Sequence, residues 1–371
     1  MAKRTFLIAT SLLALTLGSI TVVHADQGGS KSGEQRAETF QYTGVRSHGE
    51  PVRNAVAPST MSTLPSTSTP SVAGDAADGD AAWLQSLSKV INTAGVLGKA
   101  ASKPITCHGT CQTMTGNVAL IPVWVGAWAP ADLTKWNTVL SNIVTSLGSG
   151  ATNSVALPGH VLNTNALYFT TKSKVAPTLQ WVNNTAITAP TATSVSDANV
   201  ATDINTFIAA HPTIVPTGAT PIYMYIGAKT TRLTSGFGTA YCGWHSYGTT
   251  STLKNVQYLA IQDFTSTYFA ACAQQTVSPN GSTSLDAMAS VLTHEIDETL
   301  TDPFLNAWYD SFGSENADKC AWTFGATTTT AGYAYNVTLG GLKYLIQQNW
   351  LANNLITATG LSASSACSVT G

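Results

Sequence analysis

Residues 290–303 read SVLTHEIDETLTDP, and this stretch decides how the rest of the chain is interpreted. It ends a predicted helix, Ser284–Leu300, whose two ends are marked by suitable residues. Ser284 can cap the first turn, Asp286 suits the positive end of the helix dipole, and Pro303 prevents the helix from continuing. The stretch therefore predicts a well-bounded helix.

The polar residues of this helix have the spacing of a metal-binding motif. His294 and Glu298 are four residues apart, so they project from the same face and can meet at one point. This is the layout of the HExxH helix of zincin metallohydrolases, with Glu298 in place of the second histidine. In that chemistry the two spaced side chains hold Zn²⁺, and the glutamate after the first histidine takes a proton from metal-bound water. We therefore predict His294 and Glu298 as metal ligands and Glu295 as the catalytic base.

A further ligand is expected from the acidic segment that follows, TDPFLNAWYDSFGSENADKC, residues 301–320. Asp318 is the first candidate because a disulfide from the cysteine two residues on can fix its position, and Glu315 is the second. Asp302 is third, since the proline after it directs the chain away from the helix axis. His245, in the sequence CGWHS, is a candidate catalytic residue that stabilises a transition state or acts as a ligand.

The donor set leaves the identity of the metal open. One imidazole with two carboxylates can hold Zn²⁺, which we expect, and also Mn²⁺ or Ca²⁺. The alternative is that His294 and Glu298 form an ordinary hydrogen-bonded helix pair, with the acidic segment simply solvated.

Strand-like and helix-like stretches alternate along residues 96–371. The predicted strands cover residues 118–128, 160–170, 178–188, 221–228 and 255–262, and the predicted helices cover residues 131–147, 197–210 and 284–300. The expected fold is α/β (α+β), a single disulfide-bonded domain with a mixed sheet and a zincin-like HExxE helix.

Six cysteines lie within this domain, and an even number in an exported chain favours three disulfides. Sequence alone allows 15 pairings of six cysteines. We expect Cys107–Cys111, Cys242–Cys272 and Cys320–Cys367, because each pair joins neighbours in the chain or brackets one segment. A zinc-thiolate site is the rival interpretation, but the paired Cys-x-x-Cys spacing that it needs is absent.

The N-terminal part divides into two segments. Residues 1–25 have a basic start, an apolar run and small residues before Asp26, which predicts a cleaved secretory signal peptide. Residues 26–95 are rich in Ser, Thr and Pro and are predicted to be a disordered linker or pro-segment, with one short amphipathic helix at residues 83–94. The mature protein is thus expected to be secreted and extracellular.

Charge narrows the range of partners. Cleavage after residue 25 removes two basic residues, so the mature chain has 15 Lys and Arg, 19 Asp and Glu, and a net charge of −4. Nucleic acids and anionic membranes require a concentrated basic surface, and neither is expected as a partner. We expect a monomer whose partner is an extracellular protein or peptide, or a cell-wall component.

Aromatic residues are interpreted mainly as core. Trp124, Trp128 and Trp136 are expected to pack in the interior rather than to form a carbohydrate platform. In the late segment KYLIQQNW, residues 343–350, Tyr344 is the residue expected to reach a functional site.

Several of these stretches together resemble the phosphate-induced protein 1, or EXORDIUM, family of secreted plant proteins and their microbial relatives. The similar segments are VWVGAW (123–128), YCGWHS (241–246), SPNGSTSLDAMASVLTHEIDETLTDPFLNAWYD (278–310), ENADKCAW (315–322) and AYNVTLGGLKYLIQQNW (334–350). The resemblance implies an extracellular or cell-wall location but supplies no reaction.

The family motif resembles H-E-L-x-E-x-x-T-N-P followed by E-x-x-D-x-C. The matching residues are His294, Glu295, Glu298, Glu315, Asp318 and Cys320. Asp302 and Asp310 depart from the plant-type pattern, which favours Asp318 or Glu315 as a ligand and makes the chain closer to the microbial members.

Two functional hypotheses follow. The first is a secreted metal-dependent hydrolase of peptidase type. The second is a non-catalytic extracellular or cell-wall-associated signalling or binding protein, in which the helix carries a structural metal or an ion pair.

Overall fold

The computed structural model describes residues 105–145, 168, 177–234, 236–248, 255–265, 269–311, 313–350 and 367–368. All of them belong to one compact unit, Glu34–Gly371. The predicted signal peptide (1–25), the predicted linker (26–95) and its short helix lie outside the described residues.

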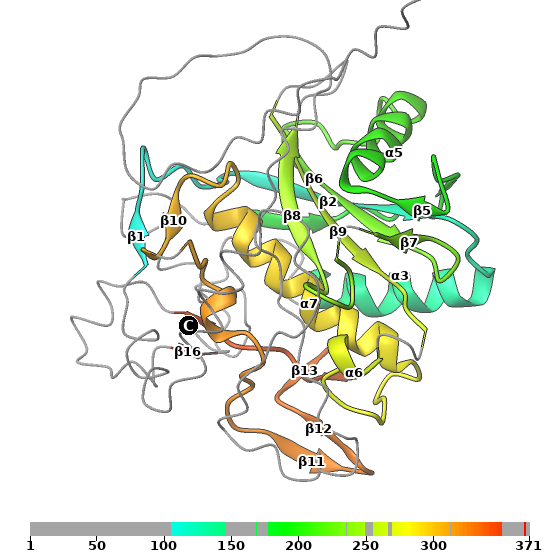
Figure 1. Ribbon diagram of the computed structural model, residues 1–371, viewed down its shortest axis with the longest axis vertical. Coiled ribbons are helices and arrows are strands. Elements are labelled where there is room, and N and C mark those ends of the chain that lie inside the picture. Colours follow the sequence, from blue (N-terminus) through cyan, green and yellow to red (C-terminus); the bar gives the residue numbers. More distant parts are fainter. Residues whose placement is uncertain are drawn as a thin grey trace, which may run out of the picture. The chain divides into compact units, whose positions relative to one another are not determined.

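A mixed sheet forms the centre of the domain (Figure 1). Its strands are β2 (Asn117–Val125), β3 (Thr178–Trp181), β4 (Ile187–Thr188), β6 (Ala219–Gly227), β8 (Trp244–Gly248) and β9 (Val256–Gln262). The order is β3-β2-β6-β9-β8, with β4 also paired to β2. All pairs are parallel except β8 with β9, which is antiparallel. The predicted mixed sheet and α/β class are therefore confirmed.

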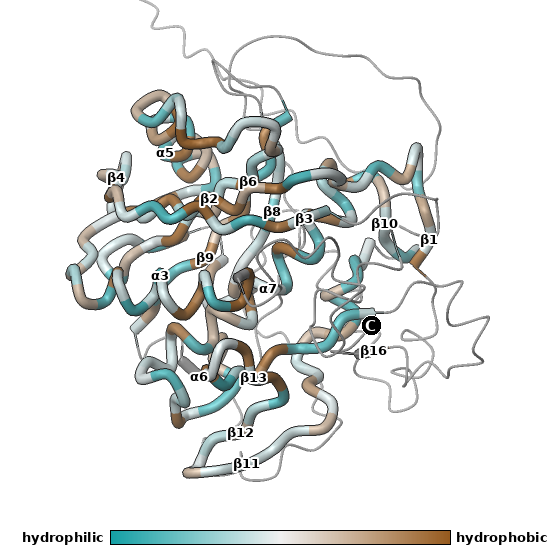
Figure 2. Tube along the Cα trace, turned by 180° about the vertical axis from the view of Figure 1, so that it is seen from behind, coloured by the Kyte–Doolittle hydropathy of each residue, from teal (hydrophilic) through white to brown (hydrophobic). Residues whose placement is uncertain are grey.

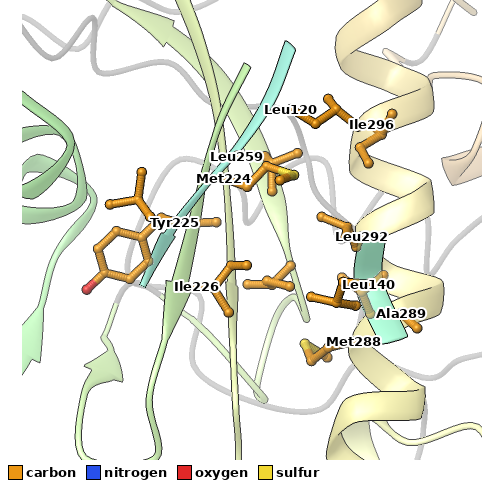
Figure 3. Close-up of a cluster of buried hydrophobic side chains, with 14 of the residues drawn as sticks. Leu120, Leu140, Met224, Tyr225, Ile226, Leu259, Met288, Ala289, Leu292 and Ile296 are labelled. Carbon is orange, nitrogen blue, oxygen red and sulfur yellow. The ribbon is translucent and has the colours of Figure 1, made fainter. Parts of the chain in front are cut away.

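Helices cover both faces of the sheet. Helix α5 (Asp197–Ala210) lies on one face, and α3 (Pro130–Thr145) and α7 (Thr283–Thr301) lie on the other (Figures 1 and 3). Leu292 and Ile296 of α7 point toward Leu259 of β9 (Figure 3), and all three are fully buried. The tube coloured by hydropathy has its hydrophobic segments along the central strands (Figure 2). Burial of this apolar surface is the main term that fixes α7 on the sheet.

One predicted strand is divided in two. Residues 178–188 form β3 and β4, separated by a break at which the buried Asn184 side chain donates a hydrogen bond to the carbonyl of Pro122 in β2. Pro122 has no N–H to donate to a neighbouring strand, so the ladder is interrupted there, and the Asn184 amide serves the Pro122 carbonyl in place of a backbone N–H.

Other elements were not predicted. They are strand β8, the short helix α6 (Phe269–Cys272), the 3₁₀-helix η5 (Asp318–Cys320), and the strand pairs β1 (Thr106–Cys107) with β10 (Trp308–Tyr309), β5 (Ser194–Val195) with β7 (Arg232–Leu233), β11 (Thr328–Thr330) with β12 (Tyr333–Tyr335), β13 (Val337–Leu339) with β14 (Leu342–Tyr344), and β15 (Asn349–Trp350) with β16 (Cys367–Ser368). Of the predicted strand 160–170 only Tyr168 is described, and its backbone is helical, so the prediction is wrong at that residue.

The three disulfides follow the expected pairing. Cys107–Cys111, Cys242–Cys272 and Cys320–Cys367 are all formed. The three tryptophans at positions 124, 128 and 136 are buried and meet edge to face, as expected for core residues. Among the described helices, none has the length and apolar character needed to cross a bilayer.

Candidate metal centre

Helix α7 supplies half of the candidate site. Its N-cap is Ser282, whose side chain accepts a hydrogen bond from the N–H of Leu285, so the predicted cap at Ser284 is displaced by two residues. The helix is buried from Ser284 to Thr301, and its apolar side packs on the sheet. His294, Glu295 and Glu298 are also buried. The polar residues of α7 are therefore covered by other parts of the chain.

Strand β8 brings in a second histidine. His245 pairs in register with Leu259 of β9, whose side chain faces α7. Because directly opposed residues point to the same face of a sheet, His245 is also directed toward α7. Gly243 precedes the strand and permits the approach, since a Cβ there would lie 2.5 Å from Val291 Cγ1 and 3.0 Å from Glu295 Oε1.

The acidic residues after α7 fall into two groups: some stabilise the loop, and the others face the site. Asp302 is the C-cap of α7, and its carboxylate accepts hydrogen bonds from the N–H groups of Asn306 and Ala307. Asp310 forms a buried ion pair with Lys319, with 2.7 Å between Oδ2 and Nζ. These two residues fix the backbone of the segment. They are also the two acidic residues that depart from the family motif.

Glu315 and Asp318 instead face α7 and β8. Asp318 Oδ1 lies 3.5 Å from His294 Nε2, and Glu315 Oε2 lies 3.2 Å from His245 Nε2. The backbone N–H of Asp318 donates to Glu298 Oε1 at 3.0 Å, which ties η5 directly to the helix. Glu298 Oε1 is also 3.1 Å from His294 Nε2, and its Oε2 is 3.6 Å from His245 Nε2.

Two groups of potential ligand atoms therefore share one residue. His294, Glu298 and Asp318 form one group, and His245, Glu295 and Glu298 form the other, with the atoms of each group within 4.8 Å of one another. All six predicted site residues, including Glu315, are thus brought together from three separate elements. The third-ranked candidate, Asp302, is engaged by backbone N–H groups instead.

Burial makes this arrangement costly without a cation. His294, Glu298, Glu315 and Asp318 each have a buried side-chain nitrogen or oxygen without a hydrogen-bond partner. Although His294 Nε2 and Glu298 Oε1 are 3.1 Å apart, they are not aligned as donor and acceptor. A buried polar atom that lacks a partner costs about 1–3 kcal/mol, and more when it is charged. These unpartnered atoms fit a bound cation, although Glu315 also has a hydrogen bond, between its Oε2 and His245 Nε2.

The electrostatics of the metal-free site show the same strain. Burial and then repulsion by Glu298 raise the pKa of Glu315 well above its usual value, and the same two causes raise the pKa of Asp318 to about 6. Burial also acts to raise the pKa of Glu298, but the charges and hydrogen bonds of His294 and His245 together outweigh it and lower that pKa to about 2. Burial acts to lower the pKa of His294, yet Glu298, Asp318 and Glu295 together outweigh burial and raise it. Without a metal, Glu315 and Asp318 therefore hold their protons to a higher pH than an exposed carboxylate does, whereas Glu298 is ionised.

One residue at the site was not predicted. Gln347, between β14 and β15, is buried, and its side-chain amide contacts Nδ1 of His294. Tyr344, which we expected to reach the site, instead donates its hydroxyl to the carbonyl of Val139 in α3. The segment 343–350 does reach the site, but through a residue three positions later. No feature of the local sequence distinguishes that glutamine from its neighbour.

Rotation of the amide lets Gln347 present an oxygen to a protonated Nδ1. That arrangement leaves the lone pair of His294 on Nε2, the atom that faces Glu298 and Asp318. Imidazoles that bind metals are usually held in this way through the other ring nitrogen. The surroundings of His294 therefore suit a ligand.

The chain is similar in sequence to known proteins. A family model described as phosphate-induced protein 1 conserved region matches residues 106–350. Protein EXORDIUM-like 3 of Arabidopsis thaliana is 37% identical over 101 residues, which cover 23% of this chain and 29% of that protein. Protein EXORDIUM-like 5 of the same plant is 32% identical over 90 residues, which cover 20% of this chain and 25% of that protein. The alignments thus span less than a third of each relative, and no solved structure matches.

Proposed function

The chain belongs to the phosphate-induced protein 1 family, and on that premise we propose that it is an extracellular protein that binds a divalent metal on α7 and acts as a metal-dependent hydrolase of peptidase type. One observation carries the proposal. Side chains from α7, β8 and the η5 segment converge in a buried cluster in which His294 Nε2, Glu298 and Asp318 lie within 4.8 Å of one another. Glu298 and Asp318 are 20 residues apart in the chain but lie side by side, and their oxygens are ligands that divalent metals accept.

The proposed roles follow from position. His294, Glu298 and Asp318 hold the ion, and Glu315 supports the site from the side of His245. Glu295, which belongs to the group formed with His245 and Glu298, would be the general base, and the ion would supply activation of the attacking water. His245 is the residue that stabilises the charge developing on the substrate. Zn²⁺ is the proposed metal, and Mn²⁺ or Ca²⁺ fits the oxygen-rich donors as well.

The location is proposed from the disulfides. All six cysteines are paired, which is typical of proteins that fold in an oxidising compartment. The partner would be an extracellular protein or peptide, or a cell-wall component, and the protein would act as a monomer.

The test combines metal analysis with an activity assay. The mature protein is purified and its metal content is measured beside that of a His294→Ala variant. Both samples are then incubated with an internally quenched peptide library. We expect bound metal and cleavage in the wild type, and less bound metal with no cleavage in the variant. If neither sample binds metal, the proposal is wrong.

A second function is favoured by a specific observation, the burial of every candidate ligand. His245, His294, Glu295 and Glu298 have exposed fractions of 0–1%, whereas a catalytic metal requires an open position for water and substrate. The alternative is a non-catalytic extracellular or cell-wall-associated signalling or binding protein with a structural metal or an ion-paired site.

Glu295→Gln separates the two functions. In the hydrolase it abolishes cleavage while metal remains bound, because the substituted residue is the base. In the non-catalytic protein there is no cleavage to lose, and the metal only raises the melting temperature. If the site is a structural Ca²⁺ site, Ca²⁺ should raise the melting temperature of the protein and Zn²⁺ should not.

A further inference from the structure

The geometry points to a site for two divalent metal ions bridged by the carboxylate of Glu298. This inference rests on the metal site proposed above and goes beyond it in number, ligands and metal class. The starting observation is that the two groups of ligand atoms take one histidine each, His294 in one and His245 in the other, and share only Glu298.

The two oxygens of the shared carboxylate are divided between the groups. Oε1 of Glu298 lies 3.1 Å from His294 Nε2, and Oε2 lies 3.6 Å from His245 Nε2. Each histidine has a further carboxylate of its own, since Asp318 is 3.5 Å from His294 and Glu315 is 3.2 Å from His245. His294 with Asp318 forms one half-site, and His245 with Glu315 forms the other. Each half-site thus has one imidazole and one carboxylate, and the carboxylate of Glu298 lies between them.

Charge favours two ions over one. Glu295, Glu298 and Glu315 are buried, the side chain of Asp318 is only 2% exposed, and the four bring up to four negative charges into a small volume. One divalent ion leaves two of these charges unbalanced, whereas two ions balance all four. Unbalanced charge in a protein interior costs several kcal/mol per ion. The buried atoms without hydrogen-bond partners are also distributed over both half-sites, on Asp318 and His294 in one and on Glu315 in the other.

The donor set identifies the class of metal. Two imidazoles with four carboxylates are the ligands of carboxylate-bridged dimanganese and di-iron centres, and no thiolate is present because every cysteine is in a disulfide. Two-metal sites hold their ions about 3.5–4 Å apart, a spacing that one bridging carboxylate can span. We therefore expect Mn²⁺ to bind in both half-sites, and Mn²⁺ is the probe used in the test.

The test is the number of ions bound by the wild-type mature protein. The protein is stripped with a chelator and dialysed against Mn²⁺, and bound manganese is measured by mass spectrometry and by electron paramagnetic resonance. We expect two ions per chain and the spectrum of an exchange-coupled pair. A single bound ion with an uncoupled spectrum would overturn the two-metal inference and leave the proposed metal site intact. No bound ion would overturn both.

Variants assign the half-sites. His294→Ala and His245→Ala should each retain one ion and lose the coupled signal, and Glu298→Gln should lose the coupling because an amide does not bridge as a carboxylate does. His211→Ala, at the C-cap of α5 on the opposite face of the sheet, is the matched control and should bind two ions. Two ions retained in His245→Ala, with coupling intact, would contradict the inference even if the other variants fail to fold.

Discussion

Replacing Gly243 by alanine tests how the site is assembled without reference to any metal. The added Cβ would lie 2.5 Å from Val291 Cγ1 in α7, about 0.9 Å closer than the 3.4 Å at which ordinary van der Waals contact begins. It would also lie 3.0 Å from Glu295 Oε1. Because Val291 is fully buried and belongs to a packed helix, the strain must be relieved by moving β8 away from α7.

Overpacking of this kind costs about 1–3 kcal/mol. A loss of 1 kcal/mol lowers the melting temperature of a domain of 150–250 residues by about 2–4 °C, so we expect a decrease of roughly 2–12 °C. The same movement carries His245 away from Glu298, so the affinity for metal should fall together with stability.

The measurement is thermal unfolding of the mature protein, followed by circular dichroism, with and without added Zn²⁺. Gly227→Ala is the matched control, because that glycine also lies at the end of a sheet strand and its Cβ would approach no atom closer than 3.3 Å. A Gly243→Ala protein that melts within 1 °C of the wild type, while Gly227→Ala does the same, would refute the close packing of β8 on α7.

Three further outcomes are expected. Gln347→Leu removes the amide that contacts His294, so Zn²⁺ affinity in a competition titration should fall about 10–100-fold, while Gln347→Glu should retain more of it. Chelator-treated protein should melt at a lower temperature as the pH rises from about 4 to 7. Burial and a neighbouring carboxylate raise the pKa of Asp318 to about 6, so the folded state binds a proton that the unfolded chain releases near 3.8. Saturating Zn²⁺ should weaken this dependence of the melting temperature on pH. Replacing Cys242 and Cys272 together by serine opens a crosslink with a sequence separation of 30, and unfolding in denaturant should show a loss of about 3–4 kcal/mol.

The fold was predictable wherever a segment carries its own signal. The helix around His294 has a capping serine, an acidic first turn and a terminating proline, and its range was correct to within one residue at either end. Helices α3 and α5 and strands β2, β6 and β9 were likewise found from their apolar spacing. Strand β8 was missed because its sequence, WHSYG, is short and contains no alternation of apolar and polar residues. Its strand character comes from pairing with β9, which is a tertiary effect.

The candidate site divides in the same way. The spacing of His294 and Glu298 places both on one helix face, so their proximity needed no structure. The approach of Glu315 and Asp318 depends on a loop that is held by the Asp310–Lys319 pair, and nothing local in the sequence encodes that geometry. The contribution of Gln347 depends on the return of the chain after β14, so it could not be derived from spacing at all.

The buried charges link the fold to the proposed function. Fully buried carboxylates such as Glu298 and Glu315 would normally be excluded from a core, because transferring an ion out of water costs more than most single contacts return. In the metal-free protein that cost appears as raised pKa values of Glu315 and Asp318, which favour their neutral forms, and as a raised pKa of His294, which favours its charged form. A metal ion reduces it without protons and also engages the buried lone pairs that have no hydrogen-bond partner. Because both arrangements use the same atoms, protons and metal must compete for them, and the stability of the domain and its affinity for metal are two measures of one electrostatic balance.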